Sequence, residues 1–159
     1  MLRFGRKPLF VCNDTTFEIA YDKVAGSLRA AGVEPKVLKY NGFCCREIAL
    51  DHARAGAIDG IDLVIGCGGG VVIDFSKCLA DFAGVPLVTM LTSSATCCAF
   101  TPIAPCYTPE GRYIYTSFFR REVAVGFTVN GFSGANPAQF IFSEIDCREI
   151  NSPMIIIIR

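Results

Sequence analysis

A glycine-rich stretch, Gly66-Cys67-Gly68-Gly69-Gly70, is the segment best suited to chemistry. An apolar run over residues 63–65 leads into it, and a helix is expected over residues 71–82. Glycines let a ligand approach the backbone closely, and the free amides and positive dipole end of a helix face an anion. We therefore expect Gly68, Gly69, Gly70 and the amide of Val71 to bind a phosphate or pyrophosphate.

Two well-known phosphate motifs do not describe this stretch. Val71 stands where the dinucleotide fingerprint has its third glycine, and the Gly-Lys-Ser/Thr of the Walker pattern does not follow. The strand expected over residues 86–90 ends without the acid that would recognise a ribose there. A glycine turn that only redirects the chain is the alternative interpretation.

Three charged residues, Asp14, Asp74 and Lys77, are further candidates for ligand binding. Asp14 follows the strand expected over residues 8–12, where a carboxylate can accept hydrogen bonds from both hydroxyls of a ribose and repel a 2′-phosphate. The alternative is an acid that stabilises a helix N-terminus. Asp74 and Lys77 share a helix face, where a solvated ion pair is the alternative to a ligand role.

Alternating strands and helices must position these residues. Strands are expected over residues 8–12, 36–40, 63–65 and 86–90, with helices over about 15–31, 45–57 and 71–82. This order predicts an α/β, Rossmann-like parallel sheet with helices on both faces. Ligands bind at the carboxyl ends of such strands, where Asp14, the glycine turn and Thr92 fall. Thr15 and Glu18 fit a capping box for the first helix.

The pattern changes after residue 92. A β-hairpin is expected from strands at 103–107 and 112–115 around the turn at 108–111, with one more strand over residues 122–125. We therefore expect one α/β domain over residues 1–125 and a divergent tail over residues 126–159.

Composition excludes several classes of function. The net charge of +0 and the lack of a basic cluster argue against a nucleic-acid partner. No apolar run approaches the ~20 residues of a membrane span. The nine cysteines form no C-x-x-C pair, which argues against a zinc cluster and favours reduced, buried thiols in the cytoplasm. His52, the single histidine, fits a partly buried or solvated helix position better than catalysis.

The ordered motifs resemble those of the iron-containing alcohol dehydrogenases and glycerol dehydrogenases. The glycine turn with Asp74 and Lys77 fits the pattern GxGGGxxxDxxK, and residues 92–97 and 107–111 continue the likeness over about residues 3–115. The resemblance implies NAD as the cofactor. It assigns cofactor binding to Asp14, Gly68, Gly69, Gly70, Val71, Asp74, Thr92, Thr96, Thr101, Ile103 and Tyr107. Loop capping and hairpin packing are the equally weighted alternative for Thr92, Thr101, Ile103 and Tyr107.

One position departs from the pattern. In similar glycerol dehydrogenases an aspartate that touches the polyol follows the threonine matched by Thr96, and Cys97 occupies that substrate position here. A thiol cannot replace a carboxylate as the acceptor for a substrate hydroxyl. Glycerol itself is therefore disfavoured as the substrate.

The resemblance also implies a second, all-helical domain that holds Fe²⁺ or Zn²⁺ through an aspartate and usually two or three histidines. The metal would polarise the alcohol oxygen. No histidine follows His52, so we expect this chain to lack that domain, to contain no catalytic or metal-ligating residue, and to be a fragment that also lacks the opening strand.

The sequence thus predicts the NAD(H)-binding portion of a metal-dependent alcohol or polyol dehydrogenase, inactive alone. A small alcohol or polyol would be the substrate of the intact enzyme, and a homo-oligomer stays open. Two alternatives remain. One is a fragment of a dehydroquinate synthase-like or glycerol-1-phosphate dehydrogenase-like enzyme, and the other is a non-catalytic nucleotide-binding module.

Overall fold

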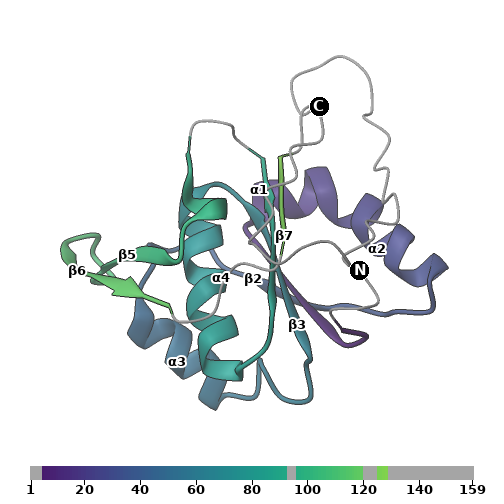
Figure 1. Cartoon of the computed structure of the whole chain (residues 1–159), viewed down its shortest axis with the longest axis horizontal. Coiled ribbons are helices and arrows are strands. Elements are labelled where there is room, and N and C mark those ends of the chain that lie inside the picture. Colours follow the sequence, from purple (N-terminus) through teal and green to yellow (C-terminus); the bar gives the residue numbers. More distant parts are fainter. Residues whose placement is uncertain (1–4, 93–95, 120–124, 129–159) are drawn as a thin grey trace, which may run out of the picture.

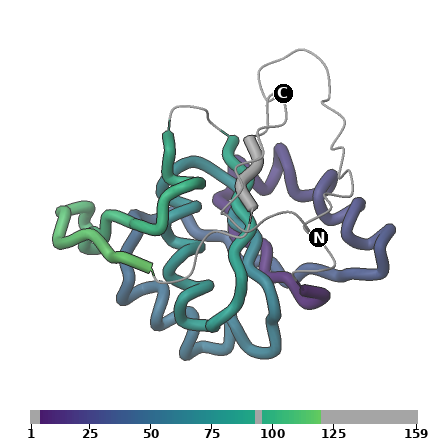
Figure 2. Tube along the Cα trace, in the orientation of Figure 1, coloured from purple at the N-terminus to yellow at the C-terminus, as the bar shows by residue number. Residues whose placement is uncertain are grey.

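A five-stranded parallel sheet forms the centre of the computed structural model, which describes residues 5–92, 96–119 and 125–128 (Figures 1 and 2). The strand order is β2-β1-β3-β4-β7, and β5 and β6 form a separate antiparallel pair. Within the described residues, no helix is long and apolar enough to cross a membrane. The elements are β1 (Pro8–Cys12), α1 (Asp14–Thr16), the π-helix η1 (Phe17–Tyr21), α2 (Asp22–Ala30), β2 (Lys36–Lys39), α3 (Arg46–Arg54), β3 (Leu63–Gly68), α4 (Gly70–Ala83), β4 (Leu87–Leu91), the 3₁₀ helix η2 (Cys98–Phe100), β5 (Ile103–Tyr107), β6 (Tyr113–Phe118) and β7 (Val125–Thr128).

The three strands β1, β3 and β4 are buried on both faces, so they are nearly continuous apolar runs rather than alternating ones. Side chains alternate between the faces. Leu9 and Val64 pack in the core cluster that contains α4 residues, whereas Phe10 and Ile65 pack in the cluster that contains α2 residues. Figure 1 shows α2 on one side of the sheet and α3 and α4 on the other. The predicted α/β, Rossmann-like architecture is therefore confirmed.

Helix α4 lies close to its predicted span. It runs from Gly70 to Ala83 and ends at Gly84, whose φ of 67° lies in the left-handed region that glycine tolerates. Nine consecutive residues of α4 are buried, from Val72 to Ala80. Because α4 packs against the sheet, α3 and the hairpin, most of its circumference is covered. Helix α3 is shorter than predicted and ends before Gly56, whose φ is 86°.

The first helix begins with a different capping box from the predicted one. The side chain of Asn13 accepts a hydrogen bond from the Thr16 amide at 2.8 Å, and the Thr16 hydroxyl accepts one from the Asn13 amide at 3.1 Å. The prediction of Thr15 with Glu18 was wrong because the helical turn starts directly after β1, two residues earlier. A π-helix over residues 17–21 follows, and the sequence pattern did not indicate it.

The hairpin prediction is confirmed. Thr108 and Arg112 pair across the turn at 2.8 Å, and Gly111 has a φ of 87°. Strand β7 pairs in parallel with β4 as an outer strand of the sheet, with Val88 opposite Val125 and Leu91 opposite Thr128. It starts where the predicted last strand ends and spans the predicted boundary after residue 125. Residues 122–124 of that strand and residues 129–159 of the tail lie outside the described residues, so the division at 125 stays a prediction.

Candidate functional site

Two glycines near the end of β3 are required by packing. An ideal Cβ on Gly66 would lie 2.6 Å from Oγ of Ser76, and one on Gly68 would lie 2.8 Å from Cβ of Val72. Real Cβ atoms do not approach other atoms so closely. These positions therefore let the first turns of α4 lie directly on the end of β3.

Gly69 is different because neither packing nor backbone conformation requires a glycine there. Among the residues that the structure describes, none lies within 4 Å of an ideal Cβ on Gly69, and its φ of −77° is open to any residue. Gly69 is the N-cap of α4, and no described side chain caps the helix there. Asn, Asp and Ser are the residues that usually occupy this position. The turn thus leaves both open space and uncapped amides at the positive end of a 14-residue helix.

Asp14 lies at the carboxyl ends of β1 and β2. Its backbone amide donates to Oδ1 of Asn41 at 3.1 Å, and its Oδ2 accepts from Nδ2 of Asn41 at 2.7 Å. Nζ of Lys39 lies 3.4 Å from its Oδ1. The Asp14 side chain is 62% exposed, so it remains accessible to a ligand. The neighbouring Thr16 hydroxyl donates to the Cys67 carbonyl at 3.0 Å, which joins this corner to the end of β3.

Two threonines of the segment after β4 lie at the same turn, and a third, Thr101, caps η2. The Thr92 amide donates to the Gly68 carbonyl at 3.2 Å, and Oγ1 of Thr96 would lie 3.6 Å from a Cβ on Gly70. Thr101 follows η2, and its hydroxyl donates to the Cys98 carbonyl at 3.4 Å. Cys97, the proposed substrate position, is exposed beside Thr96. The structure therefore brings Gly68, Gly70, Thr92 and Thr96 together. The strand ends predict this for the two glycines and Thr92, and Thr96 was included through the family resemblance.

Asp74 and Lys77 form a buried ion pair. Nζ of Lys77 lies 2.8 Å from Oδ1 of Asp74, and the two side chains are only 3% and 11% exposed, respectively. Nζ of Lys77 also donates to the Ile103 carbonyl at 2.6 Å, at the start of β5. Burial raises the pKa of Asp74 above its usual value, and Lys77 opposes that rise. The solvated ion pair considered from the sequence is thus wrong, because the hairpin covers this face of α4.

Tyr107 lies at the other end of β5 from Ile103. Its amide donates to the Cys44 carbonyl at 2.8 Å. Its ring packs against Phe43 and Tyr113, with centroid distances of 6.1 and 5.9 Å. Its described contacts are thus with the hairpin and the segment before α3, and none is with the glycine turn. A cofactor role for Tyr107 stays a prediction.

His52 packs edge-on against two aromatic rings. Its ring centroid lies 6.1 Å from that of Tyr40 and 6.0 Å from that of Phe75, and these two rings stack on each other at 3.7 Å. His52 is partly buried there. This position agrees with the expected structural role.

Sequence reasoning missed two groupings. Lys39 and Asn41 contact the Asp14 carboxylate, and only their place at the carboxyl end of β2 could have indicated it. Cys44, Cys78 and Cys106 meet in the interior with their sulfur atoms within 4.8 Å of one another. Their separation of 34 and 28 positions in the sequence resembles no short metal-binding motif.

The geometry suits a dinucleotide. The uncapped amides at Gly69–Val71 can receive a pyrophosphate, and the space in front of Gly69 is open to it. Asp14 can accept hydrogen bonds from a ribose at the neighbouring strand end. The residues at this edge of the sheet therefore fit a dinucleotide.

Comparisons with known proteins agree with this geometry. The family model described as iron-containing alcohol dehydrogenase matches residues 1–125. The chain is 36% identical over 75 residues to Hydroxycarboxylate dehydrogenase A of Escherichia coli, covering 47% of this chain and 21% of that protein. It is 24% identical over 140 residues to Glycerol dehydrogenase 1 of Schizosaccharomyces pombe, covering 88% of this chain and 31% of that protein.

Solved structures show the same fold. The crystal structure of the Schizosaccharomyces pombe glycerol dehydrogenase superposes with a TM-score of 0.71 at 23% identity, covering 80% of this chain and 32% of that chain. A probable glycerol dehydrogenase from Sinorhizobium meliloti gives a TM-score of 0.69 at 21% identity, covering 79% and 33%. The chain thus spans between 21% and 33% of the length of these relatives.

Proposed function

The chain belongs to the iron-containing alcohol dehydrogenase family, and on that premise we propose that it is the NAD(H)-binding portion of a metal-dependent alcohol or polyol dehydrogenase. The open, uncapped helix start at Gly69 carries this proposal. The fold alone would be compatible with many functions, whereas an empty N-cap position with space before it has a direct chemical use.

Each part of the dinucleotide has proposed partners. The amides of Gly69, Gly70 and Val71 hold the pyrophosphate, and Gly68 lets α4 start close to β3. The Asp14 carboxylate accepts both ribose hydroxyls and repels a 2′-phosphate, so the cofactor is NAD rather than NADP. Asp74, Thr92, Thr96, Thr101, Ile103 and Tyr107 complete the proposed cofactor-binding set.

The proposed reaction transfers a hydride from the carbinol carbon of an alcohol to the nicotinamide of NAD⁺ and releases the hydroxyl proton to water, which leaves a carbonyl product. In the intact enzyme a bound Fe²⁺ or Zn²⁺ would supply Lewis-acid polarisation of the alcohol oxygen. Within the described part of the chain the single histidine, His52, packs against Tyr40 and Phe75. The described residues therefore do not offer the expected set of one aspartate with two or three histidines. The 159-residue chain alone should therefore bind NADH but not oxidise alcohols.

Cys97 narrows the substrate class. It is exposed beside Thr96, where similar glycerol dehydrogenases have an aspartate for the polyol. A thiol is a poor acceptor for a hydroxyl. We therefore propose an alcohol or polyol other than glycerol, and added metal with glycerol should leave the purified chain inactive.

We also propose a compartment and an assembly, from the cysteines and from the exposed side chains of β6. All eight described cysteines are free, in keeping with a cytoplasmic protein. Tyr113, Ile114 and Phe118 of β6 are between 52% and 80% exposed, and such an apolar face is suited to contact with a second copy. Sedimentation at several concentrations would test the proposed homo-oligomer, and a monomer at all of them would remove it.

NADH titration tests the main proposal. Binding is followed by energy transfer from the tyrosines, because the chain has no tryptophan, and by calorimetry. We expect saturable binding by the wild type and loss of binding in Gly69→Asp, whose carboxylate would occupy the same amides and repel the pyrophosphate.

Gly26→Asp is the matched control. Gly26 is exposed in α2 and also has nothing within 4 Å of an ideal Cβ, so the same chemical change should leave NADH binding intact. Circular dichroism melts establish that all three proteins fold. Equal NADH affinity in folded wild type and Gly69→Asp would overturn the proposal.

A further inference from the structure

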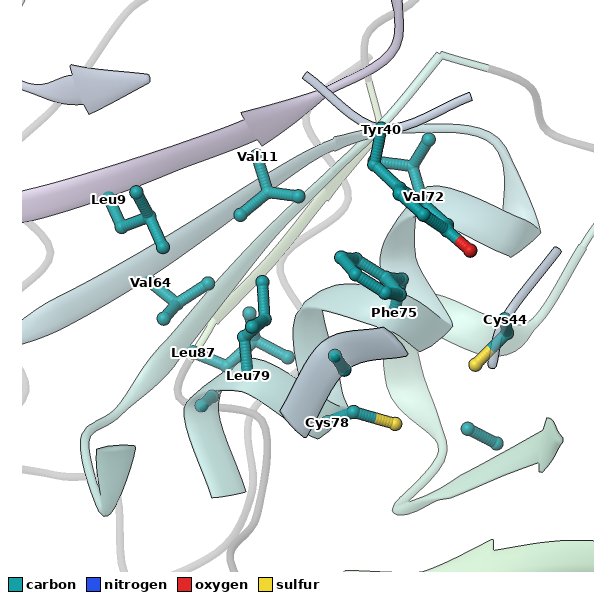
Figure 3. Close-up of a cluster of buried hydrophobic side chains, with 13 residues drawn as sticks. Leu9, Val11, Tyr40, Cys44, Val64, Val72, Phe75, Cys78, Leu79 and Leu87 are labelled. Carbon is teal, nitrogen blue, oxygen red and sulfur yellow. The ribbon is translucent and has the colours of Figure 1, made fainter. Parts of the chain in front are cut away.

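Three buried cysteines from distant parts of the sequence meet between α3, α4 and the hairpin. Cys44 precedes α3, Cys78 lies in α4 and Cys106 lies in β5. Their sulfur atoms all lie within 4.8 Å of one another, and each residue is at most 1% exposed. Figure 3 shows Cys44 and Cys78 in the core cluster with Tyr40 and Phe75.

The three thiols face one another and polar groups. Interaction with Cys44 and the positive charge of Arg46 lower the pKa of the Cys78 thiol, whereas interaction with Cys78 and burial raise that of Cys44. The Cys106 sulfur lies 3.4 Å from the Ser117 hydroxyl and 3.6 Å from the Ala104 carbonyl. A cation beside a thiol stabilises its thiolate, which is the form that binds metals. Burial as small apolar groups would not require the three sulfurs to converge.

We propose that Cys44, Cys78 and Cys106 form a binding site for a soft metal ion, Cu(I), held by three sulfur ligands. Thiolates select Cu(I), Zn²⁺ and iron–sulfur clusters over harder ions. Structural Zn²⁺ takes four protein ligands, and the described residues place three ligating side chains here. With metal–sulfur bonds of about 2.3 Å, three sulfurs in a plane lie about 4 Å apart. The sulfurs would therefore need to approach by less than about 1 Å from their present separations of up to 4.8 Å.

The proposed ion would join three segments that now meet through few polar contacts. The Tyr107 amide donates to the Cys44 carbonyl at 2.8 Å, and Lys77 donates to the Ile103 carbonyl at 2.6 Å. Cu(I) would add a direct link from β5 to α4 and to the segment before α3. The site is built from this chain's own residues, and its test does not depend on whether the chain binds NAD.

Competition with the coloured Cu(I)–bicinchoninate complex tests the proposal on the reduced, full-length chain under anaerobic conditions. The wild type should withdraw one Cu(I) per chain, and X-ray absorption should show a copper shell of three sulfurs. Loading should also raise the melting temperature, because a ligand that binds only the folded chain stabilises it. Cys78→Ala and Cys106→Ala each remove a direct ligand. Each should therefore weaken Cu(I) binding by more than the roughly 10–100-fold that is lost when an outer-shell partner is removed.

Two matched variants control for the other thiols. Cys67 is equally buried on the opposite face of the sheet, and Cys97 is exposed, so Cys67→Ala and Cys97→Ser should keep wild-type Cu(I) affinity. Equal losses in the controls, no Cu(I) uptake by the folded wild type, or preferential uptake of Zn²⁺ would each overturn the proposal. A copper shell with fewer than three sulfurs would also overturn the proposal. The same holds if a mild oxidant forms a Cys44–Cys78 disulfide and the reduced chain does not bind Cu(I).

Discussion

The first and second turns of α4 belong to one sequence pattern, but the first is open and the second is buried. The first turn, at Gly69–Val71, is open and offers backbone amides without a side-chain cap. The second turn carries Asp74 and Lys77, whose charges pair with each other in the interior. The pattern GxGGGxxxDxxK therefore combines an open turn, the proposed pyrophosphate site, with a buried clamp, the ion pair of Asp74 and Lys77. The clamp holds the start of β5 through the carbonyl of Ile103.

This difference shows that residues of one motif can have opposite surroundings, one group open and the other buried. The open turn depends on the lack of a side chain at Gly69, which leaves space in front of the helix amides. The clamp depends on the charged side chains of Asp74 and Lys77. Substitutions in the open turn should therefore change binding more than stability. Substitutions in the clamp should do the opposite.

Replacement of Lys77 by Met should give the largest effect. The Asp74 carboxylate would stay buried without its partner, and breaking a buried ion pair from one side costs about 3–5 kcal/mol. Urea unfolding of the wild type and Lys77→Met measures the loss. Lys23→Met, at an exposed position of α2, is the matched control and should change the free energy of unfolding by less than about 0.5 kcal/mol.

A double substitution sharpens the same test. Lys77→Met with Asp74→Leu removes both charges, and paired apolar replacements of a buried ion pair are often neutral or stabilising. The double variant should therefore be more stable than Lys77→Met alone. If Lys77→Met unfolds at the same urea concentration as the control, the clamp does not contribute to stability.

Gly68→Ala should have the next largest effect on stability. Its Cβ would lie 2.8 Å from Cβ of Val72, so the start of α4 would have to move away from β3. Overpacking of this kind costs about 1–3 kcal/mol. Urea unfolding again provides the measurement, with Gly26→Ala as the control because its Cβ has open space. An unchanged midpoint would mean that the first turn of α4 is free to shift.

Asp14→Ser should alter cofactor choice more than stability. NADH would lose its ribose acceptor, whereas Lys39, which lies 3.4 Å from the carboxylate, would remain to attract a 2′-phosphate. We expect the ratio of NADPH to NADH affinity to rise by about tenfold, equivalent to about 1.4 kcal/mol. Parallel titrations with both cofactors measure the ratio. Asp22→Ser, which removes another acid at a helix start, should leave it unchanged.

The sequence predicted the elements that depend on local patterns. The apolar run at β1, the long helix α4 and the hairpin turn with Gly111 all follow from periodicity and turn chemistry. The capping box was misplaced because Thr15 with Glu18 and Asn13 with Thr16 offer similar side chains in neighbouring registers. Only the point at which β1 ends decides between them.

Contacts between distant residues were beyond the sequence. The burial of Asp74 and Lys77 depends on where the hairpin folds back, and no local pattern indicates that. The meeting of Cys44, Cys78 and Cys106 likewise requires α3, α4 and β5 to be placed first. The position of Asp14 could be predicted because the strand ends of a parallel sheet share one edge, whereas its contacts with Lys39 and Asn41 depend on the register of β1 with β2.

Gly69→Asp should have the smallest effect on stability, and that effect should be a gain. An Asp at the N-cap accepts hydrogen bonds from the first helical amides, and a negative charge there is worth about 0.3–1 kcal/mol through the helix dipole. Urea unfolding should therefore show Gly69→Asp to be as stable as the wild type or more stable, while NADH binding is lost. Since the open turn is kept uncapped at a cost in stability, a clear destabilisation in this variant would mean that Gly69 serves packing after all. The contrast between the two turns of α4 would then disappear.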